Sequence, residues 1–222
     1  HSDLRRQRQM CIRDSPNTPT ETAVSVRGAD FSFHPRKLDF RLENGTAQYG
    51  MDFDRFGRRY VCSNSRHIRM VMWERQGFPP NPHYQMPSPI IDLATPAAEV
   101  FRLSQDEPWR IVRTRWRVSG IAKGPVEGGG RVSGYFTSAT GITIYEGDAL
   151  GDEFYGNAFI GDVGSNLVHR KIVQNVPGRR QPIAVRADDE QTSEFLASSD
   201  NWFRPTSFCN GPDGCLYITD MY

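Results

Sequence analysis

The chain alternates short apolar runs with turn residues, and helical periodicity is rare. Segments 141–148, 157–164 and 166–173 are rich in β-branched and aromatic residues, and glycine, aspartate or asparagine bounds them. Such runs predict short β-strands. Residues 110–118, RIVRTRWRV, alternate apolar and basic side chains, which predicts a strand with one solvent-exposed face. Residues 95–103, TPAAEVFRL, predict a helix of about one or two turns.

A hairpin signature recurs along the chain. Residues 54–61, DRFGRRYV, and residues 213–218, DGCLYI, each join a turn containing Asp and Gly to an aromatic and a β-branched residue that open a strand. Residues 159–162, FIGD, repeat the strand half alone. This recurrence predicts the blades of a β-propeller in an all-β chain, and a β-sandwich is the alternative. Residues 76–96 are rich in proline, which predicts a long surface loop.

The N-terminal segment changes the boundaries of the domain. Residues 5–15, RRQRQMCIRDS, back-translate, apart from the last base, into the transposon adapter used to prepare sequencing libraries. We therefore expect residues 1–15 to be a translated adapter and residues 16–25 an extended tail. We expect residues 26–222 to be a partial β domain, truncated at both ends. A basic arm that binds nucleic acid is the alternative for residues 1–15.

Composition excludes several classes of function. The formal net charge of +1 falls to about −1 without residues 1–15, so no basic field indicates a nucleic-acid partner. No apolar run reaches the length that spans a membrane. Beyond residue 15 the cysteines are Cys62, Cys209 and Cys215, which include no CxxC pair. We expect free thiols, with a local bridge between Cys209 and Cys215 as the alternative.

Longer segments are specific enough to indicate a family. They are QYGMDFDRFGRRYVCSNSRHI (48–68), YFTSATGITIYEGD (135–148), GNAFIGDVGSNLVHRKIV (156–173), EFLASSDNWFRP (194–205) and GPDGCLYITDMY (211–222). In this order they resemble the propeller of the membrane-bound dehydrogenase proteins of planctomycetes and verrucomicrobia. That propeller is similar to quinoprotein glucose/sorbosone dehydrogenases. The resemblance covers residues 26–222 and implies about three blades of a six-bladed, incomplete β-propeller.

The resemblance also implies a function. It implies a secreted enzyme, periplasmic or extracellular, that oxidises a sugar or alcohol with pyrroloquinoline quinone and calcium. Electrons would pass to a cytochrome c domain, carrying haem c, that lies outside these residues, as would any membrane attachment. The alternatives are a non-catalytic cell-surface propeller that binds carbohydrate or protein, and a calcium-dependent hydrolase of the lactonase kind.

Two neighbouring residues of the segment NLVHRK form the first candidate site. His169 is the candidate catalytic base for a sugar hydroxyl, and Arg170 is a candidate ligand of the quinone carboxylates. Adjacent strand residues face opposite ways, so both reach one pocket only if a bulge or a strand end intervenes. The alternative is that both residues fix the packing of the strand.

The other candidates lie near turns. Trp202 could stack on a sugar or cofactor ring and Arg204 could bind an anion. The alternative is a structural plug, in which Trp202 lies in the interface between blades and Arg204 pairs with Asp200. Asp162 and Asp220 occupy analogous places in their repeats and are candidate calcium ligands. The alternative is that they cap turns that face solvent. His67 follows the first repeat, and we expect an exposed histidine there.

Overall fold

A computed structural model describes residues 25–37, 39–78 and 81–222. The expectations for residues 1–15 and for most of the tail 16–25 therefore lie outside the described residues. The β-strands are β1 (Asp30–Phe33), β2 (Phe40–Glu43), β3 (Gly50–Phe53), β4 (Arg59–Ser63), β5 (Arg66–Val71), β6 (Ile90–Asp92), β7 (Ala139–Ile144), β8 (Ala158–Asp162), β9 (Leu167–Gln174), β10 (Ile183–Val185), β11 (Leu196–Ala197), β12 (Pro205–Asn210) and β13 (Leu216–Asp220). The helices are α2 (Pro108–Val118) and the short 3₁₀ turns η2 (Arg75–Gly77), η3 (Glu127–Gly130), η4 (Asp152–Phe154) and η5 (Asp188–Glu190).

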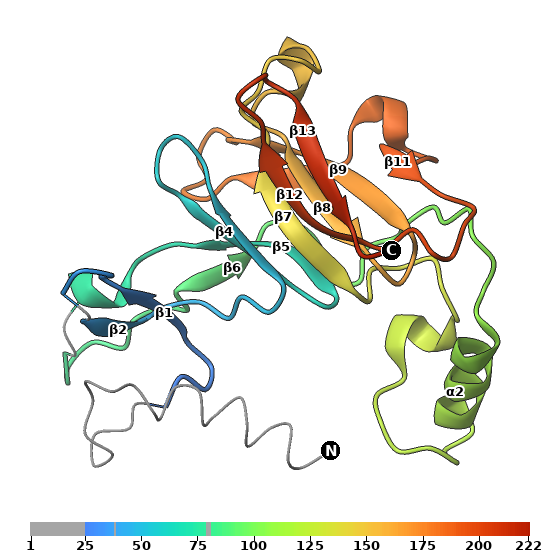
Figure 1. Ribbon diagram of the computed structural model, residues 1–222. Helices are drawn as coiled ribbons and strands as arrows, with labels where there is room; N and C mark the ends of the chain where they lie inside the picture. The colour runs from blue at the N-terminus through green and yellow to red at the C-terminus, as the bar shows by residue number, and fades with distance from the viewer. Residues whose placement is uncertain (1–24, 38, 79–80) are drawn as a thin grey trace.

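Antiparallel sheets dominate the chain, which confirms the predicted all-β class. One sheet has the order β3-β4-β5-β6, and the next has the order β7-β8-β9-β10 with β11 on β9. Two hairpins, β1-β2 and β12-β13, complete the described strands (Figure 1). Strands that follow one another in the chain are therefore neighbours in each sheet. Within the described ranges the sheets do not close into a barrel or a ring.

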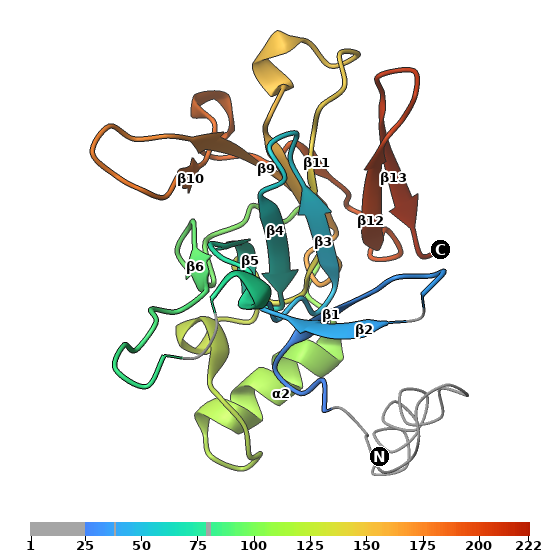
Figure 2. The same ribbon diagram turned by 90° about the vertical axis from the view of Figure 1, so that its left-hand side faces the viewer.

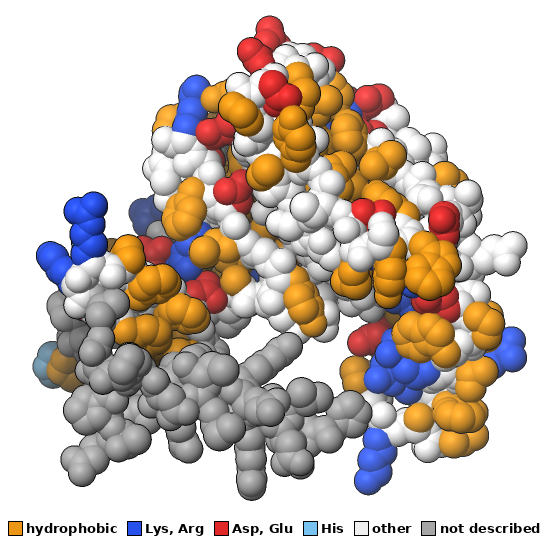
Figure 3. Space-filling model, viewed as in Figure 1, with side chains coloured by type: hydrophobic (Ala, Val, Ile, Leu, Met, Phe, Trp, Pro, Cys, Tyr) orange, Lys and Arg blue, Asp and Glu red, His pale blue; other side chains and the backbone are white. Residues whose placement is uncertain are grey.

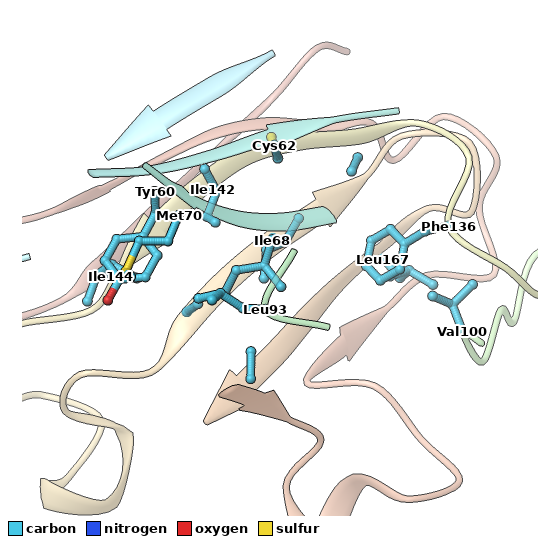
Figure 4. Close-up of a cluster of buried hydrophobic side chains, with 14 residues drawn as sticks. Tyr60, Cys62, Ile68, Met70, Leu93, Val100, Phe136, Ile142, Ile144 and Leu167 are labelled. Carbon is cyan, nitrogen blue, oxygen red and sulfur yellow. The ribbon is translucent and has the colours of Figure 1, made fainter. Parts of the chain in front are cut away.

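The sheet β7-β8-β9-β10 is the centre of the molecule because both of its faces are covered. Alternate residues of β8 and β9 point to opposite sides, so Ile160 and Leu167 join one hydrophobic cluster while Phe159 and Val168 join another. The first cluster contains side chains of β4 and β5, and Figure 4 shows it. The second contains Phe208 of β12. The central sheet thus lies between the sheet β3–β6 and the hairpin β12–β13.

Three antiparallel units follow one another in the chain: the sheet β3–β6, the sheet β7–β10 and the hairpin β12–β13. Their first strands lie side by side. β3 and β12 both pack against β7. Two side chains bind the backbone of Ile144 at the end of β7: its N–H donates to Asp52 Oδ2 (2.8 Å) and its carbonyl accepts from Asn210 Nδ2 (2.9 Å). Thr140 Oγ1 also donates to the Pro205 carbonyl (2.8 Å). Polar contacts therefore join β7 to the first strand on either side.

Most of the predicted strands are present. β7, β8 and β9 lie within or across the segments 141–148, 157–164 and 166–173, and the turns at Asp54–Gly57 and Asp213–Gly214 close the hairpins β3-β4 and β12-β13. In its described part the predicted loop 76–96 contains the end of η2 and the short strand β6, and is otherwise irregular.

Two element predictions are wrong. Residues 110–118 form most of helix α2 rather than a strand. Pro108 begins the helix, where its missing N–H costs nothing, and the residue before it, Glu107, is extended. Residues 95–103 contain no helix; they turn and make one bridge, Glu99 to Tyr135. Helix α2 lies below the sheets in both ribbon views (Figures 1 and 2).

Candidate functional site

The turn between β8 and β9 is held by two arginines from distant parts of the chain. Arg110 of α2 is buried and donates from Nη1 to the Gly164 carbonyl (2.8 Å). Arg204, just before β12, donates from Nη1 to the Val163 carbonyl (2.6 Å). Both are charge-assisted hydrogen bonds to backbone groups, so they fix the turn strongly. The turn therefore ties α2 and β12 to the central sheet.

Asp162 supports the same turn from inside. It is fully buried, its Oδ1 accepts the Gly164 N–H (2.9 Å) and its Oδ2 accepts the Thr137 N–H (3.2 Å). Burial raises the pKa of Asp162, while these two N–H donors and nearby Arg110 act in the opposite direction. Asp162 thus caps backbone groups of a turn, as the alternative suggested, but it is buried and does not face solvent.

Arg204 and Asp220 lie together. The Arg204 N–H donates to Asp220 Oδ1 (2.8 Å), and the Arg204 guanidinium forms an ion pair with Glu107 (2.7 Å). Arg204 therefore pairs with Glu107, not with the Asp200 expected for a structural plug. Asp220 is exposed at the end of β13, opposite Pro205.

A cavity of about 290 Å³ lies beside these groups. It opens near the starts of β7 and β12 and near the ends of β4, β8 and β13, which are the second strands of the three units. The residues that line it are Tyr49, Asn64, Ser138, Thr140, Val163, Thr206 and Met221. Hydroxyl and amide side chains supply donors and acceptors, and Met221 and Val163 supply apolar surface. Most of the lining surface is apolar, so the cavity suits a small neutral molecule that has apolar surface as well as a few polar groups.

Trp202 lies near Tyr222, at the edge of this region. Its ring meets the Tyr222 ring edge-on at 4.8 Å, and 64% of Trp202 is exposed. Within the described residues Trp202 is therefore not packed between two units. Asp200 accepts the Trp202 N–H (2.9 Å) and so shapes the local turn.

His169 lies elsewhere, in a buried polar network. Its Nδ1 is 2.6 Å from Glu194 Oε2, and both side chains are fully buried. Arg186 forms an ion pair with Glu194 (3.2 Å), and the Phe101 N–H donates to Glu194 Oε1 (2.9 Å). Burial lowers the pKa of His169, so its neutral ring donates Nδ1–H to the carboxylate.

Arg170 points to the opposite side of β9 from His169. β8 and β9 pair regularly, from Ala158 opposite Lys171 to Asp162 opposite Leu167. No bulge therefore turns the side chains of His169 and Arg170 to the same face. The Arg170 guanidinium is buried against Phe154 (4.5 Å) and forms ion pairs with two acidic residues, Asp189 (2.6 Å) and Glu190 (2.7 Å).

The structure thus brings some of the predicted site residues together and separates others. Asp162, Arg204 and Asp220 surround the β8–β9 turn and the start of β12, and Trp202 lies close by. His169 and Arg170 are two strands away from β7 in the central sheet, on opposite faces. Sequence reasoning missed Glu107, Arg110 and Glu194, whose roles depend on partners far away in the chain.

His67 is buried, which overturns the expectation of an exposed histidine. It is 1% exposed, its ring stacks on Phe136 (4.2 Å) and meets the ring of His169 edge-on (5.7 Å). Neither ring nitrogen has a hydrogen-bond partner among the described residues. Burial lowers the pKa of His67 well below its ordinary 6.5, and neighbouring His169, Lys171 and Arg186 act in the same direction.

This burial predicts a pH dependence of stability. Unfolded His67 takes up a proton near pH 6.5 and folded His67 does not, so the free energy of unfolding decreases as the pH falls below 6.5. The slope is about 1.4 kcal/mol per pH unit, which gives roughly 2 kcal/mol between pH 6.5 and pH 5. In urea denaturation, the free energy of unfolding of the wild type should fall by about 2 kcal/mol more than that of His67→Phe between pH 6.5 and pH 5. His83→Phe, at an exposed position, is the control. Equal pH dependence in His67→Phe and the wild type would contradict the prediction.

The sequence suggests calcium and pyrroloquinoline quinone as cofactors, and the described residues show whether their candidate ligands are free. No group of three or more His, Cys, Asp or Glu side chains able to hold a metal ion occurs in the described part of the chain. Both Asp162 oxygens accept backbone N–H groups, and the guanidiniums of Arg170 and Arg204 are paired with carboxylates. These residues therefore do not fit calcium or the quinone carboxylates.

Cys62 is a buried free thiol, and Cys209 and Cys215 are exposed free thiols.

Comparison with known proteins gives a family without an assigned function. No helix in the described ranges combines the length and apolar character that crossing a bilayer requires. No curated protein matches the chain, and no solved structure does. A family model described as a domain of unknown function (DUF7133) matches residues 8–222, a range that includes residues 8–15 of the adapter-like segment. Because this match covers nearly the whole sequence, the chain belongs to the DUF7133 family.

Proposed function

We propose that the chain supplies consecutive blades of a β-propeller, and that this propeller binds the substrate of a quinoprotein-like dehydrogenase that oxidises a sugar or alcohol. The observation that carries the proposal is the side-by-side packing of β3, β7 and β12, each the first strand of an antiparallel unit built in chain order. Blades of a propeller are such units arranged around an axis, with their first strands innermost. The β3–β6 and β7–β10 sheets and the β12–β13 hairpin would be neighbouring blades.

The cavity at the starts of β7 and β12 supports a role in binding a small neutral molecule with a few polar groups. Two of its lining residues, Asn64 and Val163, occupy the turn after the second strand of successive units, and Met221 follows the second strand of the next. Equivalent positions of successive blades would therefore meet at one end of the axis. Hydroxyl groups of Ser138 and Thr206 are suited to the hydroxyls of a sugar or alcohol.

The redox part of the proposal depends on groups outside the described residues. Because the predicted calcium and quinone ligands are already paired, we assign no chemical step to Asp162, Arg170 or Arg204. His169 is likewise occupied by Glu194 and is buried away from the cavity residues. The role that we assign to this chain is to hold and orient the substrate. Secretion to the periplasm or cell exterior and transfer of electrons to a cytochrome c domain belong to the same proposal.

The same pairing favours a second function. If every charged candidate serves the structure, the cavity could bind carbohydrate without any reaction, as a cell-surface binding propeller does. The two functions share the cavity and differ only in oxidation. One experiment therefore separates them.

The experiment expresses the complete open reading frame and supplies pyrroloquinoline quinone with calcium. Quinone binding is followed by absorbance, oxidation of sugars and alcohols by a dye-linked assay, and sugar binding by calorimetry. We expect oxidation, with KM raised at least about tenfold in Asn64→Ala/Ser138→Ala, which removes two polar groups of the cavity. Ser207→Ala, an exposed hydroxyl of β12 outside the lining, should leave KM unchanged.

The outcomes distinguish the proposals. Sugar binding that the double variant weakens, without quinone binding or oxidation, would replace the dehydrogenase by the binding propeller. A folded protein that neither binds nor oxidises these compounds would contradict both functions.

A further inference from the structure

Helix α2 places three of its four arginines toward the protein and its large apolar residues toward solvent. Arg110, Arg113 and Arg117 recur at the spacing of one helix face. Arg110 is buried on the Gly164 carbonyl, and the other two lie 3.9 Å and 3.7 Å from Glu127. A helix on the surface of a globular protein normally buries its apolar face instead. The orientation of α2 is therefore inverted.

The outward face of α2 carries two tryptophans and a valine. Trp109 is 54% exposed, Val112 41% and Trp116 51%, at the spacing i, i+3 and i+7. The loop that follows continues this surface with Ile121, 74% exposed, and Val126, 50% exposed. We call residues 105–131 the α2 lobe. Figure 3 shows hydrophobic and basic side chains side by side on this lobe, at the lower right. Exposed apolar surface of this kind marks an interaction site.

The α2 lobe carries a net positive charge, with six Lys and Arg residues against three Asp and Glu residues. Residues 108–126 contain five Lys and Arg residues and no Asp or Glu, whereas the whole chain has 27 Lys and Arg and 26 Asp and Glu residues. Arg115 and Lys123 are exposed beside the apolar residues. The surface that complements the α2 lobe is therefore negatively charged and apolar beneath its charges.

We propose that the α2 lobe docks on an anionic lipid surface, with Trp109, Val112 and Trp116 inserted at the level of the headgroups. Interfacial helices combine tryptophan and aliphatic residues with Lys and Arg in this way, and their affinity sums apolar burial and attraction to anionic lipid. A protein groove would fit a single helical row, whereas the exposed apolar surface continues beyond the helix through Ile121 and Val126. Arg110 on the inner face anchors the helix to the central sheet through the Gly164 carbonyl, so docking would set the orientation of the β-sheets on the membrane.

The test uses the protein from the complete open reading frame and vesicles that contain brominated phosphatidylcholine, with or without phosphatidylglycerol. We expect quenching of tryptophan fluorescence on the anionic vesicles. Trp109→Phe/Trp116→Phe should remove that quenching, and Trp202→Phe, which changes another exposed tryptophan, should retain it. This signal reports the α2 lobe itself, whatever other region contacts lipid.

Charge variants test the second contribution. Arg115→Gln and Lys123→Gln should each weaken vesicle binding roughly fivefold, because each basic residue near an anionic surface contributes about 1 kcal/mol. Arg36→Gln, an exposed arginine of the β1–β2 turn, is the control. Absence of quenching in the folded wild type, or quenching that Trp109→Phe/Trp116→Phe leaves unchanged, would overturn the proposal. Self-association through the two tryptophans without lipid quenching would overturn it in favour of a protein contact.

Discussion

Replacing Gly141 by alanine is expected to lower the free energy of unfolding by about 3 kcal/mol or more. Gly141 lies in β7 at φ +57°, where a side chain is strained. An added Cβ would lie 2.7 Å from the Ser207 Cα and 2.8 Å from the Thr206 carbonyl oxygen. Both are backbone atoms of β12, so they cannot rotate away as a side chain can. Left-handed strain and overpacking contribute about 1–3 kcal/mol each.

The measurement is urea denaturation of Gly141→Ala beside a matched control. Gly57 has a similar φ of +73° but has no atom within 4 Å of an added Cβ. Gly57→Ala therefore reports the backbone strain alone and should lose about 1–2 kcal/mol. Equal losses in the two variants would show that β7 and β12 do not approach each other as closely as described.

Replacing Glu194 by leucine is expected to cost about 3–5 kcal/mol of unfolding free energy. The change leaves the Arg186 guanidinium, whose side chain is only 12% exposed, without its carboxylate, and it removes the acceptor of the Phe101 N–H and of His169 Nδ1–H. Removing one partner of a buried ion pair has this magnitude because the other charge stays buried.

An exposed ion pair provides the control. Glu99 lies 4.0 Å from Arg131, and their side chains are 66% and 54% exposed. Glu99→Leu should change stability by about 1 kcal/mol or less. Both variants are measured by thermal and urea denaturation at neutral pH. A loss below about 1 kcal/mol in Glu194→Leu would contradict the buried network around His169.

The pattern of the sequence predicted the central strands because their burial is reflected directly in composition. β7 and β8 are buried along their whole lengths, and such strands appear as short β-branched and aromatic runs between turn residues. The hairpin turns were also readable, since Asp and Gly satisfy the backbone locally at Asp54–Gly57 and at Asp213–Gly214.

Helix α2 was misread because its amphipathic pattern is inverted. Alternation of apolar and basic residues over 110–118 fits a strand when the apolar residues are assumed to face the core. The spacing of Trp109, Val112 and Trp116 and the proline at the helix start were the signals for a helix. The assumption failed because Arg110 takes the buried position and donates to a distant turn.

The buried network was beyond the reach of sequence patterns for a different reason. Glu194 is 25 residues from His169, and the contact depends on how the segment after β10 returns to β9. His67 gave no local sign of burial, since its ring is covered by His169 of the central sheet and by Phe136, which precedes β7. Contacts of this kind follow from tertiary packing.

An experimental structure of the complete gene product tests the propeller arrangement most directly. We predict that β3, β7 and β12 will be the innermost strands of neighbouring blades, with the cavity lined by Asn64, Ser138 and Thr206 at one end of the axis. Further four-stranded antiparallel units should continue the series until the ring closes. A structure in which the sheet β3–β6 packs face to face in a two-layer sandwich, with no axis beside β7, would contradict it.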